Sequence, residues 1–343
     1  STNSGGNHVN VFDLDQVIDE QIVPNKNYRK LYESWLATHL DSEGRPAIVQ
    51  FNHPRSVNQD YGILNFQGDM DAVRSAAAPH VRTIEIINGP HDAQDSGNRI
   101  TSIKSRAYLT YLNHGFRLAP SADQDNHFIT HGTATDHRTA VLAGALTKRD
   151  LLQAIRDRRV YASQDKNLQI FFSVNGSIMG SVVELASGSP LRIEVRLRDA
   201  DEPGASYRVS LRRDTVGDDL EATSELDHQD TEGDSTVVFD QFQYTGGEQY
   251  YLVQVIQTSD SDEAWTAPVW IVPPGGASGP DTHPPDEGVV RGPSSPTPRF
   301  VWSRARPVFH LANCRDARLI SEANRETGNT PPAGKRLHDN CPR

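Results

Sequence analysis

Asp125 and His127 stand two residues apart in the segment Pro120–His127, directly after a short strand-like run over residues 116–119. In an extended chain, residues i and i+2 point to the same side. A carboxylate and an imidazole that point together from the end of a strand can bind a divalent metal ion. The spacing therefore predicts metal chemistry at this position.

Two other histidines have a similar setting. His53 ends the strand-like segment Ala47–Pro54, and His8 lies in the short segment Gly6–Asn10. Their small or polar neighbours favour a metal ligand over a core residue. The remaining histidines of the first half lie in loop-like contexts and rank lower as ligands, namely His91, His114, His131 and His137.

The elements that must position these residues alternate between strand and helix up to about residue 165. Helical spacing of apolar residues predicts helices over 27–40, 69–77, 102–113 and 148–158. Apolar runs predict strands over 47–51, 82–87, 116–119 and 139–143. Such alternation is typical of a parallel sheet or barrel, whose functional residues lie at the C-terminal ends of the strands.

The pattern changes after Asp165. Short apolar segments separated by turn residues predict strands over 168–174, 191–197, 207–211, 236–239, 250–256 and 267–272. We expect four parts: a metallohydrolase domain over 1–165, a β-sandwich over 166–273, a linker over 274–298 rich in Pro, Gly and Ser, and a small domain over 299–343.

The order of four segments resembles the later part of a PHP (polymerase and histidinol phosphatase) domain. They are Gly6-Asn-His-Val-Asn10, Phe51-Asn-His-Pro54, Ile84-Glu-Ile-Ile-Asn-Gly89 and Asp125-Asn-His127. Three later segments are similar to the carbaryl-hydrolase-like (CehA/McbA) branch of that family, which often carries a β-sandwich after the catalytic domain. They are Arg138–Val141, Leu151–Ala162 and Asn175–Gly180.

The resemblance implies an α/β fold, a distorted (β/α)7 barrel of the PHP type, that here lacks its first strands. It also implies two or three divalent metals at the strand ends, Zn, Mn or Fe. Carried over by position, the metal ligands are His8, His53, Asp125 and His127.

Three further residues match the family less specifically. Glu85 corresponds to a family position, although a glutamate inside a strand is equally consistent with a structural role. Arg55 and Arg138 could each hold a substrate phosphate with two hydrogen bonds, or be solvated or paired with a carboxylate.

The chain departs from the family at its front end. The family begins with a His-x-His motif on its first strand, and this sequence starts after that motif. The resemblance therefore implies a non-covalent partner, the N-terminal portion of the same protein as a separate chain. Without it the barrel would expose unpaired strand edges.

Charge and hydropathy restrict the function classes. With 45 acidic and 34 basic residues, the chain has a formal net charge of −11, which argues against a general nucleic-acid coat. A nuclease whose metals supply positive charge is compatible with that balance. No apolar run approaches the roughly 18 residues of a membrane span, and we expect no membrane partner. The polar start predicts a mature, secreted or periplasmic protein.

Three functions are compatible with these observations. The first is a metal-dependent phosphoesterase in which metal-activated water attacks a phosphomonoester or phosphodiester, either a small molecule or nucleic acid. The second is hydrolysis of a carboxylic ester, amide or carbamate at the same site. The third is a non-catalytic binding module.

Two ligand pairs lie near the C-terminus, His310-Leu-Ala-Asn-Cys314 and His338-Asp-Asn-Cys341. Four nitrogen and sulfur ligands match a structural zinc site, and the segment resembles small zinc-binding tails of some secreted bacterial nucleases. The alternative is a disulfide between Cys314 and Cys341, which suits an extracellular protein.

Metal analysis of the C-terminal segment separates these two readings. We expect one zinc ion per chain, because two imidazoles and two thiolates complete a tetrahedral site. A disulfide would leave no zinc and no free thiol, and that result would contradict the zinc prediction.

Overall fold

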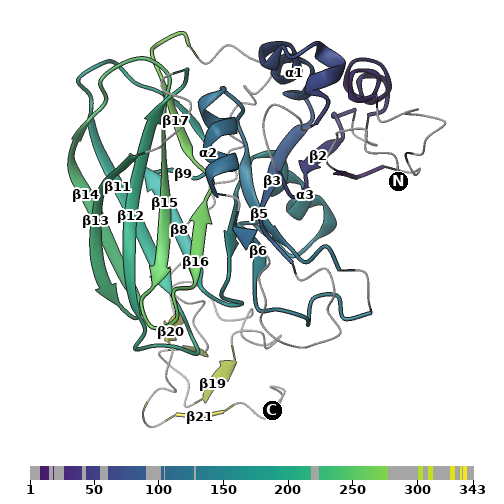
Figure 1. The fold of residues 1–343 in the computed structure, drawn as a ribbon. Helices are drawn as coiled ribbons and strands as arrows, with labels where there is room; N and C mark the ends of the chain where they lie inside the picture. The colour runs from purple at the N-terminus through teal and green to yellow at the C-terminus, as the bar shows by residue number, and fades with distance from the viewer. Residues whose placement is uncertain are drawn as a thin grey trace. The chain divides into compact units, whose positions relative to one another are not determined.

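The computed structural model of this chain describes residues 8–14, 18, 27–40, 44–54, 61–89, 102–103, 105–126, 129–217, 224–276, 300–303, 308–311, 325–328, 333 and 335–337. The chain divides into two compact units, Ser1–Gly288 and Val289–Arg343. Figure 1 shows the order of the elements along the chain. No helix among the described residues is long and apolar enough to cross a membrane.

The first half of the larger unit is built on a mixed, five-stranded sheet. β2 and β5 both pair with β3 in parallel, while β1 pairs antiparallel with β2 and β4 antiparallel with β3. The strands are β1 (Val9–Phe12), β2 (Ile48–Phe51), β3 (Val81–Asn88), β4 (Ser102–Ile103) and β5 (Ala119–Asp123). All eight residues of β3 are buried, as expected for a central strand.

The prediction of a distorted (β/α)7 barrel was wrong. The described residues are mostly β, with mixed sheets and no closed barrel. The parallel ladder ends at β5, because the next strands, β6 (Arg138–Val141) and β7 (Val160–Ser163), pair with each other antiparallel and join a different sheet.

A threonine side chain helps to explain why the ladder stops there. The hydroxyl of Thr139 accepts a hydrogen bond from Ala122 N at 2.8 Å and donates one to Ala122 O at 2.9 Å. These two bonds satisfy backbone groups of β5 that a neighbouring strand would otherwise use. After β6 and α3, the chain comes back to the C-terminal end of β6 before β7 begins. There, Leu142 N donates a hydrogen bond to Arg159 O at 2.8 Å. That return makes β7 antiparallel to β6.

The helices broadly follow the sequence pattern. The predicted helix over 27–40 contains a π-helical stretch, η2 (Lys30–Leu36), which buries Leu31, Tyr32 and Leu36. Asp69 caps α1 (Met70–Ala77) and Thr147 caps α3 (Lys148–Arg156), each through a backbone N–H three residues on. The third predicted helix begins later than expected, as α2 (Ser105–Asn113), because Ser102 and Ile103 pair with β3. A short 3-10 helix, η3 (Ile63–Phe66), precedes α1.

The second half of the larger unit is a β-sandwich, which also includes β6 and β7 from before the predicted start at residue 166. The eight-stranded sheet contains β6, β7, β10 (Val182–Glu184), β12 (Ser206–Thr215), β13 (Ser224–Glu232), β15 (Gln249–Gln257), β16 (Glu263–Thr266) and β17 (Val269–Val272). The four-stranded sheet contains β8 (Gln169–Val174), β9 (Ser177–Ile178), β11 (Pro190–Arg198) and β14 (Ser235–Gln243).

Central strand β15 contributes to two hydrophobic cores. Tyr251, Val253 and Val255 are buried in the core between the two sheets of the sandwich. Tyr250 and Leu252, which point to the opposite face, are buried in the core that contains β3 and α2. The tyrosine hydroxyl of Tyr108 on α2 donates to Thr266 O at 3.3 Å. Helix α2 therefore packs between the five-stranded sheet and the sandwich, as Figure 1 shows.

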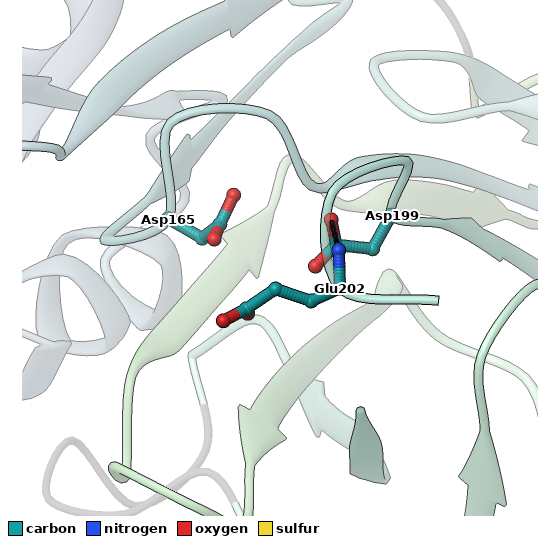
Figure 2. Close-up of side chains that lie close together, drawn as sticks. All are labelled: Asp165, Asp199 and Glu202. Atoms are coloured by element: carbon teal, nitrogen blue, oxygen red, sulfur yellow. Dashed lines mark hydrogen bonds between the residues drawn. The ribbon is translucent and has the colours of Figure 1, made fainter. Parts of the chain in front are cut away.

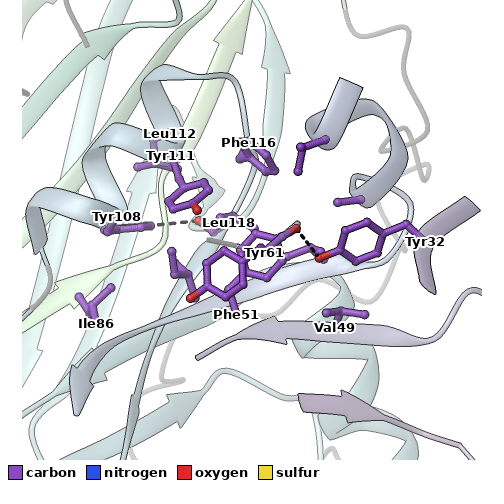
Figure 3. Packing of buried hydrophobic residues seen from close by; sticks show 14 of the residues in the cluster. Tyr32, Val49, Phe51, Tyr61, Ile86, Tyr108, Tyr111, Leu112, Phe116 and Leu118 are labelled. Atoms are coloured by element: carbon purple, nitrogen blue, oxygen red, sulfur yellow. Dashed lines mark hydrogen bonds between the residues drawn. The ribbon is translucent and has the colours of Figure 1, made fainter. Parts of the chain in front are cut away.

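An aromatic cluster supports the end of β2. The rings of Phe51 and Tyr61 stack with centroids 3.8 Å apart, and Tyr111 and Phe116 pack around them at tilted or perpendicular angles (Figure 3). The Tyr61 hydroxyl donates to Asn52 O at 2.6 Å. Because both Phe51 and Tyr61 are fully buried, this contact fixes the backbone that leads into residue 53.

The smaller unit contains a four-stranded sheet of β18 (Phe300–Ser303), β19 (Val308–Leu311), β20 (Arg325–Gly328) and β21 (Arg336–Leu337). His310 lies on β19, opposite Val301 of β18. The other proposed zinc ligands, Cys314, His338 and Cys341, lie outside the described residues, as does most of the predicted linker.

Gly180 marks a close approach between the sandwich and the end of α3. Its φ is +89°, and a Cβ there would lie 2.1 Å from Asp157 O. We expect Gly180→Ala to lower the free energy of unfolding by about 3 kcal/mol or more, from backbone strain together with overlap. Gly188→Ala is the matched control, since Gly188 has a φ of +86° and nothing within 4 Å. It should cost about 1–2 kcal/mol in denaturant unfolding. Equal losses in the two variants would contradict the close contact.

Candidate metal centre at the sheet edge

The C-terminal ends of β2, β3 and β5 meet at one edge of the five-stranded sheet. Register places Phe51 beside Ile84, and Asn88 beside Asp123. Because β1 runs antiparallel to β2, its first residues reach the same edge, and Asn52 N donates to His8 O at 3.1 Å. Residues far apart in the sequence are thereby brought together.

His8 and His53 lie in direct contact at this edge. His8 Nδ1 is 3.1 Å from His53 Nε2, and the two rings are nearly perpendicular with centroids 5.0 Å apart. Two imidazole nitrogens bound to the same tetrahedral zinc ion would be about 3.3 Å apart. The hydrogen-bonded separation is close to that value, and His8 is exposed, so the pair is open to solvent.

Glu85 lies beneath the histidines with only 1% of its surface exposed. Its Oε2 accepts a hydrogen bond from His53 N at 2.6 Å, and its Oε1 accepts one from the Asn88 side chain at 2.5 Å. These two bonds fix the orientation of the carboxylate and connect β3 to the end of β2.

Asp123 ends β5 and is held by polar side chains from two strands. Its Oδ2 accepts hydrogen bonds from Gln50 Nε2 at 2.8 Å and Ser121 Oγ at 2.9 Å. Gln50 is fixed in turn, because its Oε1 accepts from Thr83 Oγ1 at 3.2 Å. The carboxylate therefore has a single supported orientation.

Burial is the main reason that two acidic groups at this edge have raised pKa values. Burial raises the pKa of Glu85 to about 8, and the charges of Asp123 and Asp125 add to the shift. Burial also raises the pKa of Asp123, although its hydrogen bonds from Ser121 and Gln50 oppose the shift. No lysine or arginine among the described residues forms an ion pair with Glu85 or Asp123. These acidic groups therefore have no described lysine or arginine partner, and Glu85 keeps its proton up to about pH 8 in the metal-free protein.

Backbone strain coincides with two of the predicted ligands. His53 has a φ of +36° and Asp125 a φ of +46°, values that residues with a side chain rarely adopt. Each follows the end of a parallel strand, where the chain must turn sharply out of the sheet. Such strain is often retained at functional sites, because the surrounding structure holds the side chain in a required position.

Of the four predicted barrel ligands, the structure brings His8 and His53 into direct contact. The charge of Asp125 contributes to the raised pKa of Glu85, after burial and the charge of Asp123. His127 and Arg55 lie outside the described residues. Arg138 does not face this cluster as an open phosphate clamp. Its guanidinium donates to three backbone carbonyls, those of Gly132, Thr135 and His137, and so holds the loop before β6.

Sequence reasoning missed Asp123, and it did not indicate the contact between Asp123 and the buried ring of His137. His137 is 2% exposed, and its Nε2 lies 3.1 Å from Asp123 O. Burial lowers the pKa of His137 to about 4, so its ring is neutral near pH 7. The i, i+2 spacing of Asp125 and His127 extends back to Asp123, and this spacing could have identified Asp123 from the sequence.

Imidazoles and carboxylates of this kind suit Zn, Mn or Fe. The donor set fits a divalent ion for a second reason, since a cation would favour the ionised form of Glu85, whose pKa is raised by burial and by the charges of Asp123 and Asp125. The described part of the cluster is not a closed cage, because no three of its ligand atoms lie within 4.8 Å of one another. Within the cluster, the ring nitrogens of His8 and His53 have a separation close to that of two nitrogens bound to one zinc ion.

Comparisons with known proteins add no assignment. The sequence matches no protein-family model and no curated protein. Among solved structures, the soluble domain of PmoD from Methylocystis sp. is 15% identical over 30% of this chain and 90% of that domain, with a TM-score of 0.22. A match at that level carries no argument about fold or function.

The pKa of Glu85 predicts how stability changes with pH in metal-free protein. An acid whose pKa is raised from 4.5 to about 8 keeps its proton in the folded state while the unfolded state loses it. The free energy of unfolding should therefore fall by about 1.4 kcal/mol per pH unit across that window. Glu85→Gln should remove this fall, as measured by denaturant unfolding in EDTA between pH 5 and pH 8.

Glu232→Gln is the matched control, because Glu232 is exposed on β13. It removes the same charge and should leave the pH dependence of the wild type intact. An unchanged slope in Glu85→Gln would show that Glu85 is ionised in the folded protein well below pH 8.

Proposed function

We propose that this protein is a metal-dependent hydrolase whose active site is the edge formed by β1, β2, β3 and β5, and that it acts on phosphomonoesters or phosphodiesters. One observation carries the proposal. The His8 and His53 nitrogens lie 3.1 Å apart at this edge, beside the buried carboxyl group of Glu85, whose pKa is raised by burial and, to a smaller extent, by the charges of Asp123 and Asp125. The proposed activity does not require a barrel.

His8, His53 and Asp125 are the residues that would hold the metal, with Glu85 and Asp123 completing the negative charge around it. A divalent ion bound there would supply Lewis acidity, which lowers the pKa of water and neutralises charge on a phosphoryl oxygen. Zinc, manganese and iron are all compatible with this donor set.

The chain's other residues hold these ligands in place. Asn88 and the backbone N–H of His53 orient Glu85, while Gln50 and Ser121 orient Asp123. The Tyr61 hydroxyl fixes the carbonyl of Asn52, one residue before His53. Removing a residue that orients a metal ligand typically lowers metal affinity or activity by about 10–100-fold.

The proposal is tested by assaying a phosphodiester and a phosphomonoester in protein stripped with EDTA, before and after addition of Mn²⁺ or Zn²⁺. We expect hydrolysis only with metal, and a loss of about 100-fold or more in kcat/KM for His53→Ala and Asp125→Asn. His228→Ala is the control, because His228 is exposed on β13 and pairs with Glu225 at 3.1 Å. It should retain full activity.

The outcomes separate the candidate functions. Metal-dependent hydrolysis of an aryl carbamate without phosphoester hydrolysis would move the assignment to carboxyl-type substrates at the same site. Metal binding that is lost in His53→Ala, without turnover of any of these substrates, would indicate a binding module. Activity that survives both EDTA and His53→Ala would refute the proposal.

A further inference from the structure

Three carboxylates meet at one end of the β-sandwich. Asp165 lies between β7 and β8, while Asp199 follows β11 directly and Glu202 lies between β11 and β12. One oxygen from each lies within 4.8 Å of the other two, and Figure 2 shows Asp165 facing the other two from a separate loop. Oxygens bound to one Ca²⁺ at 2.3–2.6 Å can be up to about 5 Å apart, so a single ion can contact all three.

Hydrogen bonds hold these carboxylates in position. Asp199 is 1% exposed, and its Oδ2 accepts from the Tyr207 hydroxyl at 2.6 Å while its Oδ1 accepts from Asn167 Nδ2 at 2.8 Å. Asp165 Oδ1 accepts from the backbone N–H groups of Asn167 and Leu168, both at 2.6 Å. Support of this kind is typical of metal ligands, whose orientation is fixed by neighbouring donors.

Gln257, at the end of β15, supplies an independent observation beside this group. Its side-chain Nε2 donates to Glu202 Oε2 at 2.7 Å, so the amide reaches the carboxylate group. Gln257 is only 3% exposed, and its buried Oε1 has no hydrogen-bond partner among the described residues. A buried amide oxygen without a donor calls for an explanation, such as an ion.

The amide orientation of Gln257 is fixed by its surroundings. Its Nε2 also lies 3.1 Å from both Ser259 Oγ and Asp260 Oδ2. Exchanging the amide nitrogen and oxygen would place the oxygen against the carboxylates of Glu202 and Asp260, which is repulsive. The buried oxygen of Asn167 likewise has no partner among the described residues, so two amide oxygens at this site lack a donor.

Negative charge is concentrated around this group. Burial raises the pKa of Asp262 to about 6, and the charges of Asp260, Asp165 and Glu202 contribute to the shift. The nearby Lys166 pairs instead with Asp201 at 3.5 Å. No described lysine or arginine forms an ion pair with Asp165, Asp199 or Glu202. A bound cation would therefore gain favourable interactions that no described side chain provides.

We propose that Asp165, Asp199 and Glu202, together with the amide oxygen of Gln257, bind one Ca²⁺ ion. The donors are all oxygen, from carboxylates and an amide, which is the set that Ca²⁺ prefers. Mg²⁺ retains several waters and is rarely enclosed by protein oxygens alone. Since β7 and β15 belong to the eight-stranded sheet and β11 to the four-stranded sheet, the ion joins the two sheets of the sandwich.

The test uses the full chain, stripped with EDTA and dialysed. CaCl₂ at about 100 times the dissociation constant should raise the Tm by about 5–10 °C. Tb³⁺, an oxygen-seeking substitute for Ca²⁺, should luminesce on tyrosine excitation, because the Tyr207 hydroxyl lies 2.6 Å from Asp199 Oδ2. Added Ca²⁺ should compete that signal away.

The double variant Asp165→Asn, Glu202→Gln should lose both the Ca²⁺-dependent Tm shift and the terbium signal, because it removes two of the three ligand charges. Asp240→Asn, an exposed carboxylate on β14, is the control and should keep both responses. No Tm shift in the wild type, or equal shifts in the wild type and the double variant, would overturn the proposal. His53→Ala should keep the terbium signal, because His53 belongs to the proposed hydrolase site and not to the Ca²⁺ site. The Ca²⁺ proposal can therefore hold even if the hydrolase proposal fails.

Discussion

The hydrogen bond from His53 N to the buried carboxylate of Glu85 is the interaction on which the sheet edge depends. It joins the turn after β2 to the middle of β3 at 2.6 Å, and so holds the backbone of His53 at a φ of +36°. Burying a carboxylate is costly unless it is hydrogen-bonded or paired, and Glu85 has both oxygens bonded. Burial of Glu85 raises its pKa, and the same buried group fixes the backbone of His53.

The aromatic cluster beneath β2 makes that arrangement possible. Phe51 and Tyr61 stack face to face, and the Tyr61 hydroxyl holds Asn52 O at 2.6 Å, so the residue before His53 is anchored from the core side. Glu85 then anchors His53 itself from the sheet side. A histidine fixed from both directions loses little conformational freedom when it binds a ligand, which is the basis of preorganisation.

Much of the local structure could be predicted from the sequence. Apolar spacing located β2, β3 and α3 to within a few residues, and the alternation in β11 was clear because Leu191, Ile193, Val195 and Leu197 all face the core. The sequence also indicated His8 and His53 as metal ligands, and the structure places their ring nitrogens 3.1 Å apart, while metal binding itself stays a prediction. These successes share a cause, since periodicity and strand ends are local properties of the chain.

The global arrangement could not be predicted in the same way. Strand β13, with the sequence Ser-Glu-Leu-Asp-His-Gln-Asp-Thr-Glu, is an edge strand without an apolar pattern, so nothing local signals it. The direction of β7 depends on a return path fixed by Leu142 and Arg159, and not on the residues of β7. The contact between Gln257 and Glu202 could not be predicted, because the two residues are 55 positions apart in the sequence.

Strands β6 and β7 complete the eight-stranded sheet through the pairing of β7 with β16, although they lie in the chain before the rest of that sheet. The sandwich therefore cannot be exchanged between proteins as a cassette that begins at β8. Recombination at that point would remove β7, the neighbour of β16, and with it Ala162 from the hydrophobic core. The five-stranded sheet and the sandwich are therefore expected to be inherited together, as a single unit of descent.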